Sequence, residues 1–126
     1  MVNIDPAAWL ELGLDFAGFD DRRRMVHHKT NLQRFVAHYG ASPEAHSAIF
    51  NNFQGMDIPQ AHMAKPDPKS LLMATHWLKT YPKESQMSGF WKLDEKTCRN
   101  RVWKYVKAIA ALKGLKVRAD DCNVFQ

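Results

Sequence analysis

The sequence predicts an all-α fold, a small helical domain that contains a helix-turn-helix. Apolar residues recur at helical spacing along most of the chain, and residues that cap or start helices precede these segments. No segment shows the strict polar–apolar alternation of a half-buried strand. At 126 residues, with 45% hydrophobic content, the chain has the size of one domain that can form its own core.

The first half of the chain predicts two helices behind an N-terminal segment. Residues 1–20 are rich in large apolar side chains but contain Gly13 and Gly18, so they predict either a short helix or an arm. A helix is expected from about Arg22 to His38, ended by Gly40, and another from Ser42-Pro43-Glu44 to about Phe53. The apolar side of the first of these helices would hold Met25, Leu32, Phe35, Val36 and Tyr39.

The second half predicts three more helices after a proline-rich connection at 55–68. Asp67-Pro68 is a cap followed by a helix start, and the helix from Lys69 to Tyr81 is apolar nearly all round, so we expect it at the buried centre. After Pro82 we expect a short helix from Lys83 to Trp91 and a tight turn at Lys92-Leu93. Asp94 then caps a long helix from Glu95 to about Lys113, which Gly114 ends.

The long helix has two different faces. Its apolar residues recur at spacings of 4, 3, 4 and 3, within about 40° of a common direction, and predict a core seam made of Cys98, Val102, Tyr105, Ile109 and Leu112. On the opposite side lie Lys96, Asn100, Trp103 and Lys107, flanked by Arg99 and Lys104. One face is therefore expected in the core and the other in solvent.

Charge is distributed unevenly along the chain. Residues 1–68 hold six Lys or Arg and eight Asp or Glu, a net of −2, whereas residues 69–118 hold twelve and three, a net of +9. The formal net charge of the whole chain is +5. A segment of fifty residues this basic is typical of a protein that binds a polyanion such as nucleic acid.

A short helix, a tight turn and a longer basic helix together predict a helix-turn-helix that binds double-stranded DNA. Ser88 would provide the small residue where the helices cross, and Leu93 the apolar residue beneath the turn. The first turns of the second helix would place Lys96, Arg99 and Asn100 at base edges, because Arg pairs with guanine and Asn with adenine. Phosphate contacts are expected from Lys83, Lys92, Lys104 and Lys107. Trp103 would stack on a sugar or shield a phosphate contact, or else be buried under the N-terminal segment with Trp9, Phe16 and Phe19.

Three segments resemble a known family. Leu71–Pro82 (LLMATHWLKTYP) and Met87–Cys98 (MSGFWKLDEKTC) resemble the helix-turn-helix that precedes the catalytic domain of Harbinger (PIF-type) DDE transposases. Arg34–Glu44 (RFVAHYGASPE) is similar to the segment ahead of that motif, so the resemblance extends from Arg34 to about Lys113. It implies DNA binding at transposon ends and a nuclease domain with three acidic metal ligands, expected beyond Gln126. The family pattern favours glycine where Lys92 stands.

These features divide the chain into an N-terminal arm at 1–20, a helical N-terminal part at 21–66, a helix-turn-helix DNA-binding region at 67–118 and a C-terminal tail at 119–126. We expect no enzymatic activity from this chain, no cofactor and no metal site, because its six histidines and two cysteines lack ligand spacing and no nucleophile or phosphate-loop motif is present. Cys98 is expected to be an inert core residue, and no membrane segment is expected.

The predicted DNA binding places the protein in the nucleus if its source is eukaryotic, and inside the cell otherwise. The alternative prediction is a helical adaptor whose basic face binds an acidic protein partner, with the helix-turn-helix as a scaffold. A protein partner or a homodimer is compatible with the aromatic N-terminus and with an exposed Trp103, since buried aromatic residues anchor protein interfaces.

Overall fold

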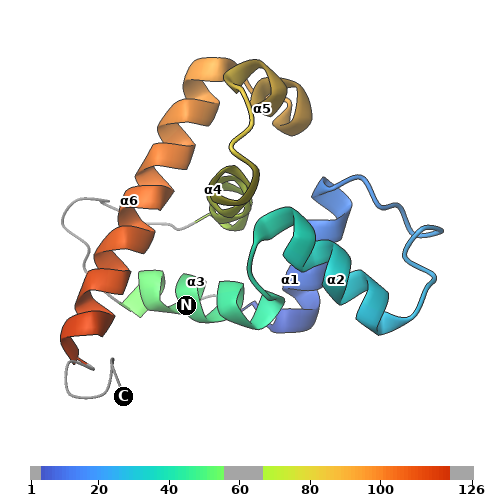
Figure 1. The fold of residues 1–126 in the computed structure, drawn as a ribbon, viewed down its shortest axis with the longest axis horizontal. Coiled ribbons are helices and arrows are strands. Elements are labelled where there is room, and N and C mark those ends of the chain that lie inside the picture. The colour runs from blue at the N-terminus through green and yellow to red at the C-terminus, as the bar shows by residue number, and fades with distance from the viewer. Residues whose placement is uncertain (1–3, 56–66, 120–126) are drawn as a thin grey trace.

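Six α-helices and no strand make up the residues that the computed structural model describes, 4–55 and 67–119 (Figure 1). The predicted all-α class is confirmed. The helices are α1 (Pro6–Phe16), α2 (His28–Tyr39), α3 (Pro43–Gly55), α4 (Pro68–Thr80), α5 (Glu84–Trp91) and α6 (Glu95–Ala119). Most of the predicted connection at 55–68 and tail at 119–126 lies outside the described residues, as does Cys122. Within these residues, no helix combines the length and the apolar character needed to cross a membrane.

Helix α4 lies at the centre of the fold. It contacts α2, α3 and α6, and Figure 1 shows it nearly end-on between the other helices. Every residue from Ser70 to His76 is buried. The prediction of a buried central helix is therefore confirmed, and its cause is the composition of this segment, which is apolar around most of its circumference.

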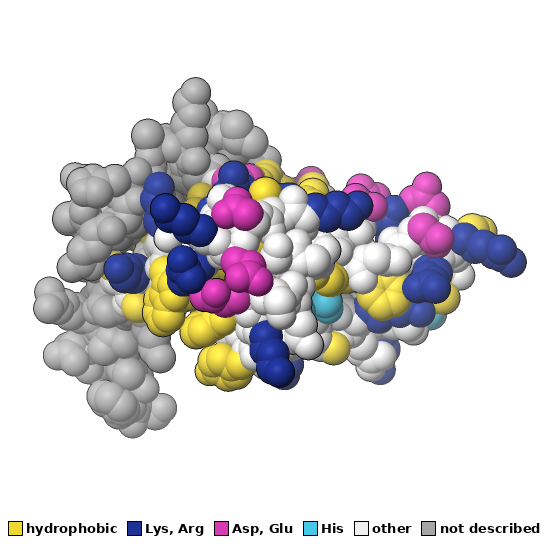
Figure 2. Space-filling view, turned by 90° about the horizontal axis from the view of Figure 1, so that it is seen from above, with side chains coloured by type: hydrophobic (Ala, Val, Ile, Leu, Met, Phe, Trp, Pro, Cys, Tyr) yellow, Lys and Arg dark blue, Asp and Glu magenta, His cyan; other side chains and the backbone are white. Residues whose placement is uncertain are grey.

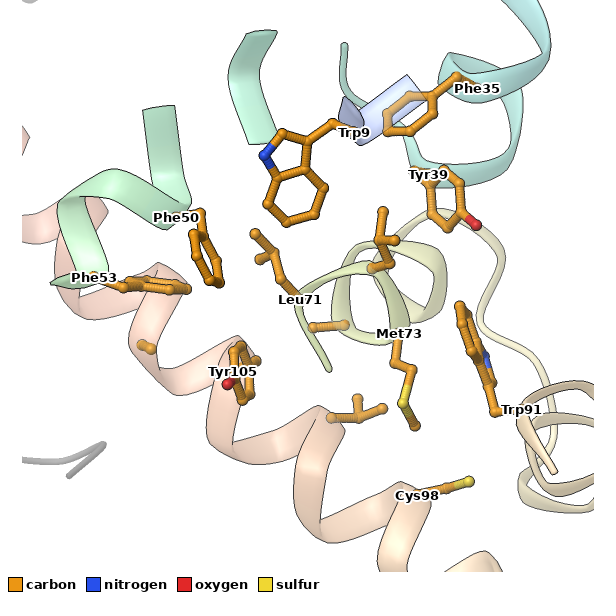
Figure 3. Close-up of a cluster of buried hydrophobic side chains, with 14 of the residues drawn as sticks. Trp9, Phe35, Tyr39, Phe50, Phe53, Leu71, Met73, Trp91, Cys98 and Tyr105 are labelled. Carbon is orange, nitrogen blue, oxygen red and sulfur yellow. The ribbon is translucent and has the colours of Figure 1, made fainter. Parts of the chain in front are cut away.

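One hydrophobic core joins the two halves of the chain across α4 (Figure 3). The core residues on the side of α1, α2 and α3 include five large aromatic side chains, namely Trp9, Phe35, Tyr39, Phe50 and Phe53. On the other side α5 and α6 contribute smaller groups together with Trp91 and Tyr105. The rings of Phe53 and Tyr105 are 6.0 Å apart and connect α3 directly to α6.

Aspartate–proline pairs start two of the helices. The Asp5 carboxylate accepts a hydrogen bond of 2.8 Å from the N–H of Ala8, and Pro6 follows as the first helical residue. Asp67 accepts from the N–H of Lys69 at 3.3 Å at the start of α4. Such caps satisfy backbone donors that have no partner inside the helix, each typically stabilising it by about 1 kcal/mol.

The N-terminal segment is a helix rather than an arm, and Gly13 does not interrupt it. Helix α1 runs continuously past Gly13, and the absence of a side chain there lets α2 approach closely. A Cβ atom at this position would stand 2.2 Å from Cε2 of Phe35. The Tyr39 hydroxyl donates a 2.6 Å hydrogen bond to the Gly13 carbonyl at the same contact. This glycine serves packing, which its position in the sequence alone does not reveal.

The prediction of a helix from Arg22 is wrong in its start, because α2 begins only at His28. Upstream, the Asp20 carboxylate accepts from the N–H of Arg23 at 2.9 Å and forms a local turn. The His27 ring caps α2 by accepting from the N–H of Lys29 at 3.1 Å. Met25, expected on the packed side, is 82% exposed, and Val36 is 40% exposed.

The predicted end of α6 is also wrong, since the helix continues through Gly114 to Ala119. A glycine inside a helix costs only about 1 kcal/mol relative to alanine. Leucine and lysine, which favour helix, surround Gly114, and their summed preference outweighs that cost.

Within residues 4–55 and 67–119, two non-glycine residues adopt the left-handed conformation, and each ends a helix. Tyr81 follows α4 with a φ of 48°, and Lys92 follows α5 with a φ of 58°. A side chain in this conformation costs about 1–2 kcal/mol. The backbone at Lys92 therefore has the geometry that glycine adopts most easily.

Candidate nucleic-acid interface

Helix α5, the Lys92-Leu93 turn and the start of α6 form the predicted helix-turn-helix. The Ser88 hydroxyl donates a 2.5 Å hydrogen bond to the carbonyl of Leu93, which ties α5 to the turn. Asp94 caps α6, accepting from the N–H of Thr97 at 3.1 Å. The Thr97 hydroxyl and then the Thr97 N–H stabilise the carboxylate and lower the pKa of Asp94. The predicted Asp94 cap is confirmed, and Ser88, predicted as the small residue where the helices cross, has the additional role of a hydrogen-bond donor to the turn.

Contacts with the hydrophobic core and with α4 hold α5 in place. Met87 and Trp91 are buried on one face of this short helix. The Lys69 ammonium, from α4, donates to the Trp91 carbonyl at 3.3 Å and satisfies an acceptor at the C-terminal end of α5. Tertiary contacts therefore fix a helix of eight residues, which would be unstable by itself.

The two faces of α6 separate in the structure as the sequence predicts. On the inner face Cys98, Val102, Tyr105, Ala108 and Leu112 are buried, and Ile109 packs against the core. Burial raises the pKa of the Cys98 thiol, in keeping with an inert core residue. The outer face exposes Lys96, Arg99, Asn100, Trp103, Lys104 and Lys107. Lys83 and Lys92, at the two ends of α5, are exposed as well.

The eight predicted DNA contacts therefore all lie at the surface around α5 and α6. Between Lys83 and Lys107 the chain holds seven basic and three acidic residues, a net charge of +4. Figure 2 views the molecule from the side on which α5 and the start of α6 lie, and shows basic, acidic and exposed hydrophobic side chains interspersed there. The surface therefore carries a net positive charge, although exposed acidic residues lie among its basic residues.

Arg99, a predicted base contact, is already engaged with an acidic residue. Its Nη1 lies 3.1 Å and 3.3 Å from the two carboxylate oxygens of Glu84, at the start of α5. Both side chains are about half exposed, 46% for Arg99 and 51% for Glu84. Glu84 was not among the predicted site residues. It faces α6 from the first turn of α5, across the helix-turn-helix itself.

Trp103 does not pack under α1. Its indole lies 5.3 Å from that of Trp77 in α4, and 46% of the residue is exposed. The predicted alternative of burial with Trp9, Phe16 and Phe19 is therefore wrong. Trp9 instead packs against His46 and Phe50, and Phe16 against Trp91. Trp77 is the neighbour that sequence analysis missed, although α4 and α6 were both expected to contribute to one core.

Among the described residues, His46 and His76 are buried and His38 is partly buried, and the three are not arranged around a site. His46 is 0% exposed, and its Nδ1 donates to the Ser42 carbonyl at 2.9 Å while its Nε2 lies 2.9 Å from the Thr75 hydroxyl. His38 stacks on His76 with ring centroids 4.2 Å apart. Desolvation, followed by the neighbouring His76, lowers the pKa of His38 to about 4. In the described part of the chain, no three His, Cys, Asp or Glu side chains gather as metal ligands would.

Comparisons of the chain with models of protein families, with curated proteins and with solved structures found no match.

Proposed function

We propose that this protein binds duplex DNA through its helix-turn-helix, with α6 as the recognition helix and no catalytic role for this chain. The observation that carries the proposal is the division of α6 into a buried apolar face and an exposed face that bears Lys96, Asn100, Lys104 and Lys107. A recognition helix needs this division, because it must be held by the core and still reach into the major groove.

The exposed groups suit distinct roles. Asn100 can form paired hydrogen bonds with adenine, worth about 1–3 kcal/mol of discrimination against other bases. Lys83 and Lys92 at the ends of α5, with Lys104 and Lys107 further along α6, suit phosphates and would fix the register of the protein on the duplex. Arg99 suits guanine, and in the free protein the Glu84 carboxylate holds its guanidinium. On DNA, Arg99 would exchange this carboxylate for a base edge.

The resemblance to Harbinger-type transposases leads us to propose further that the chain is, or derives from, the DNA-binding N-terminal part of such a protein, and that it acts in the nucleus if its source is eukaryotic and inside the cell otherwise. The left-handed backbone at Lys92 is compatible with this relationship, since the family pattern favours glycine there.

A fluorescence anisotropy titration with a labelled random duplex at several salt concentrations tests the proposal. For about four to six phosphate contacts, the slope of log affinity against log salt should be about −4 to −5. A flat salt response would contradict DNA binding through this surface.

A second candidate function is that of an adaptor for an acidic protein partner. The partial exposure of Trp103 favours it, because aromatic side chains often anchor protein interfaces. Competition separates the two candidates. Duplex DNA should displace the labelled duplex far better than an acidic polypeptide of equal charge if the surface recognises DNA, and no better if any polyanion suffices.

A further inference from the structure

Three aromatic side chains from two helices meet at the surface beside the candidate interface. Trp77 and Tyr81 lie one turn apart on α4 and its C-terminal cap, and Trp103 comes from α6. The ring centroid of Trp77 is 5.3 Å from that of Tyr81 and 5.3 Å from that of Trp103. We call these three residues the aromatic patch. Because the rings of Tyr81 and Trp103 each lie 5.3 Å from that of Trp77, the distance between these two outer rings is at most twice 5.3 Å.

The exposure of this patch is not explained by stability. Tyr81 is 69% exposed and Trp103 is 46% exposed, so neither ring is removed from water as a core ring would be. Tyr81 also sits in the left-handed conformation with a φ of 48°, which bulky residues rarely adopt. A large exposed ring in a strained position contributes little to the fold, and such positions are often functional.

Basic residues flank the patch. Arg99 and Lys107 lie one helical turn before and after Trp103 on α6, and both are exposed. Lys104 directly follows Trp103 on α6 and is exposed as well. Exposed rings beside cations are the combination with which proteins bind unpaired nucleotides, because bases stack on the rings and phosphates meet the cations.

A small hollow beside the patch limits what it can hold. It is lined by residues of α4, α5 and α6, including Trp77, Trp103 and Arg99, and its volume is about 50 Å³. One water molecule occupies about 30 Å³ in the liquid. A nucleobase therefore cannot enter the hollow, and would have to lie on the exposed rings themselves.

We propose that the aromatic patch binds unpaired bases of a DNA strand that continues beyond the duplex held by the start of α6. This inference rests on the proposed function and extends it. Trp103 lies seven residues after Lys96, about 10 Å further along the helix axis. A duplex whose groove receives the first turns of α6 could thus extend a single strand over Trp103 and Tyr81. Two or three consecutive nucleotides could reach both rings, since bases are about 3.4 Å apart when stacked and further apart when extended.

Three DNA probes with the full chain test this inference. They are a blunt duplex, the same duplex with a four-thymidine overhang, and the same duplex with an overhang of four abasic nucleotides, which carries the same charge without bases. The wild-type protein should bind the thymidine overhang about 5- to 150-fold more tightly than the abasic overhang, which corresponds to stacking of one base.

Variants then assign this preference to the patch. Trp103→Ala should abolish it, Trp103→Phe should retain most of it, and Met25→Ala, which changes an 82% exposed apolar residue far from the patch, should leave it unchanged. Thermal unfolding followed by circular dichroism checks that Trp103→Ala is folded. If it is not, the comparison of Tyr81→Ala with the wild-type protein serves the same purpose.

The outcomes distinguish the inference from the proposed function. Equal binding of both overhangs by the wild-type protein, with salt-dependent binding of the blunt duplex, would overturn the inference and leave the proposed function intact. Loss of all three probes alike in Trp103→Ala would also overturn it, because Trp103 would then belong to the duplex surface. Failure of the wild-type protein to bind any probe would overturn both. Tighter binding of an acidic peptide than of any probe, lost in Trp103→Ala, would make the patch a protein-docking surface instead.

Discussion

The first three helices and the last two use their side chains in opposite ways. Residues 4–55 hold five basic and six acidic residues, close to neutral, and direct Trp9, Phe35, Tyr39 and two further phenylalanines into the core. The segment from Lys83 to Lys107 has a net charge of +4, and α6 turns a complete face to solvent. Buried aromatic side chains stabilise the fold. A row of exposed cations instead destabilises the free protein by mutual repulsion, and it contributes favourable energy only when an anion binds.

This contrast implies that stability and binding can be altered separately. A change in the core between α1 and α2 should lower the free energy of unfolding without changing the affinity of the folded protein for DNA. A change on the exposed face of α6 should do the reverse. The following predictions run from the largest expected effect to the smallest.

Among the single substitutions, Gly13→Ala should give the largest loss of stability. The new methyl group would stand 2.2 Å from Cε2 of Phe35, so α1 and α2 must separate or Phe35 must leave its rotamer. Overpacking of this kind costs about 1–3 kcal/mol. Urea unfolding measures the change, and salt-dependent DNA affinity should be unaltered at low urea.

Gly89→Ala is the matched control. Gly89 lies inside α5, and a Cβ atom there would meet nothing within 4 Å. The same substitution should therefore stabilise the protein slightly, by up to about 1 kcal/mol, through helix propensity. Equal destabilisation by both variants would contradict the role of Gly13 in the contact between α1 and α2.

Acid should destabilise the protein through histidines that the fold shields from water. Desolvation lowers the pKa of His46, and it lowers the pKa of His38 to about 4. In the unfolded chain these rings take up protons near pH 6.5, whereas in the folded protein they stay neutral. Stability is therefore complete above about pH 6.5 and falls as the pH drops toward 4, by at most about 1.4 kcal/mol per pH unit for each fully buried ring.

Urea unfolding between pH 7.5 and 5 measures this slope. His38→Phe keeps an aromatic ring against His76 and Phe90, whose rings lie 4.2 Å and 5.3 Å from that of His38, but cannot take up a proton. This variant should have a shallower dependence on pH than the wild-type protein. A stability that does not change over this range would show that the histidines are not shielded as the fold indicates.

Glu84→Gln should have a small effect, on binding rather than on stability. It removes a negative charge from the basic surface and releases Arg99, whose Nη1 lies 3.1 Å from the Glu84 carboxylate. Since half-exposed ion pairs contribute about 0–1 kcal/mol, we expect little change in unfolding and a roughly 2- to 5-fold gain in duplex affinity.

Glu44→Gln changes the net charge equally at an exposed position on α3 and should not alter affinity. A loss of affinity in Glu84→Gln would mean instead that Glu84 positions Arg99 for DNA.

Sequence patterns predicted the C-terminal half of the fold more accurately than the N-terminal half. Around α4, α5 and α6 the signals are local: Asp67 and Asp94 accept from backbone N–H groups two or three residues away, and the apolar seam of α6 follows helical periodicity. The errors at Gly13 and Arg22 lie in the N-terminal half and have other causes, whereas the C-terminal half holds one error, the end of α6 at Gly114. Gly13 is set by the approach of α2, and Asp20 forms a turn where a helix start was expected.

The candidate site was predictable in part for the same reason. Periodicity places Lys96, Asn100 and Lys107 opposite the core seam, and the structure exposes all three. It gives no information on contacts between helices, so the ion pair of Arg99 with Glu84 and the contact of Trp103 with Trp77 could not be predicted. Both join residues of different helices, whose relative placement depends on tertiary packing.

The central claim, that the exposed face of α6 binds DNA phosphates, is tested most directly by two charge-matched triple variants in the salt titration. Lys96→Gln/Lys104→Gln/Lys107→Gln changes α6, and Arg22→Gln/Arg23→Gln/Lys29→Gln changes three exposed residues at or just before the start of α2. The α6 variant should lose about 1.8 from the magnitude of the log–log slope, because Lys104 and Lys107 are expected phosphate contacts and each such contact contributes about 0.9, while the control keeps the wild-type slope. Equal slopes for the two variants would contradict the claim.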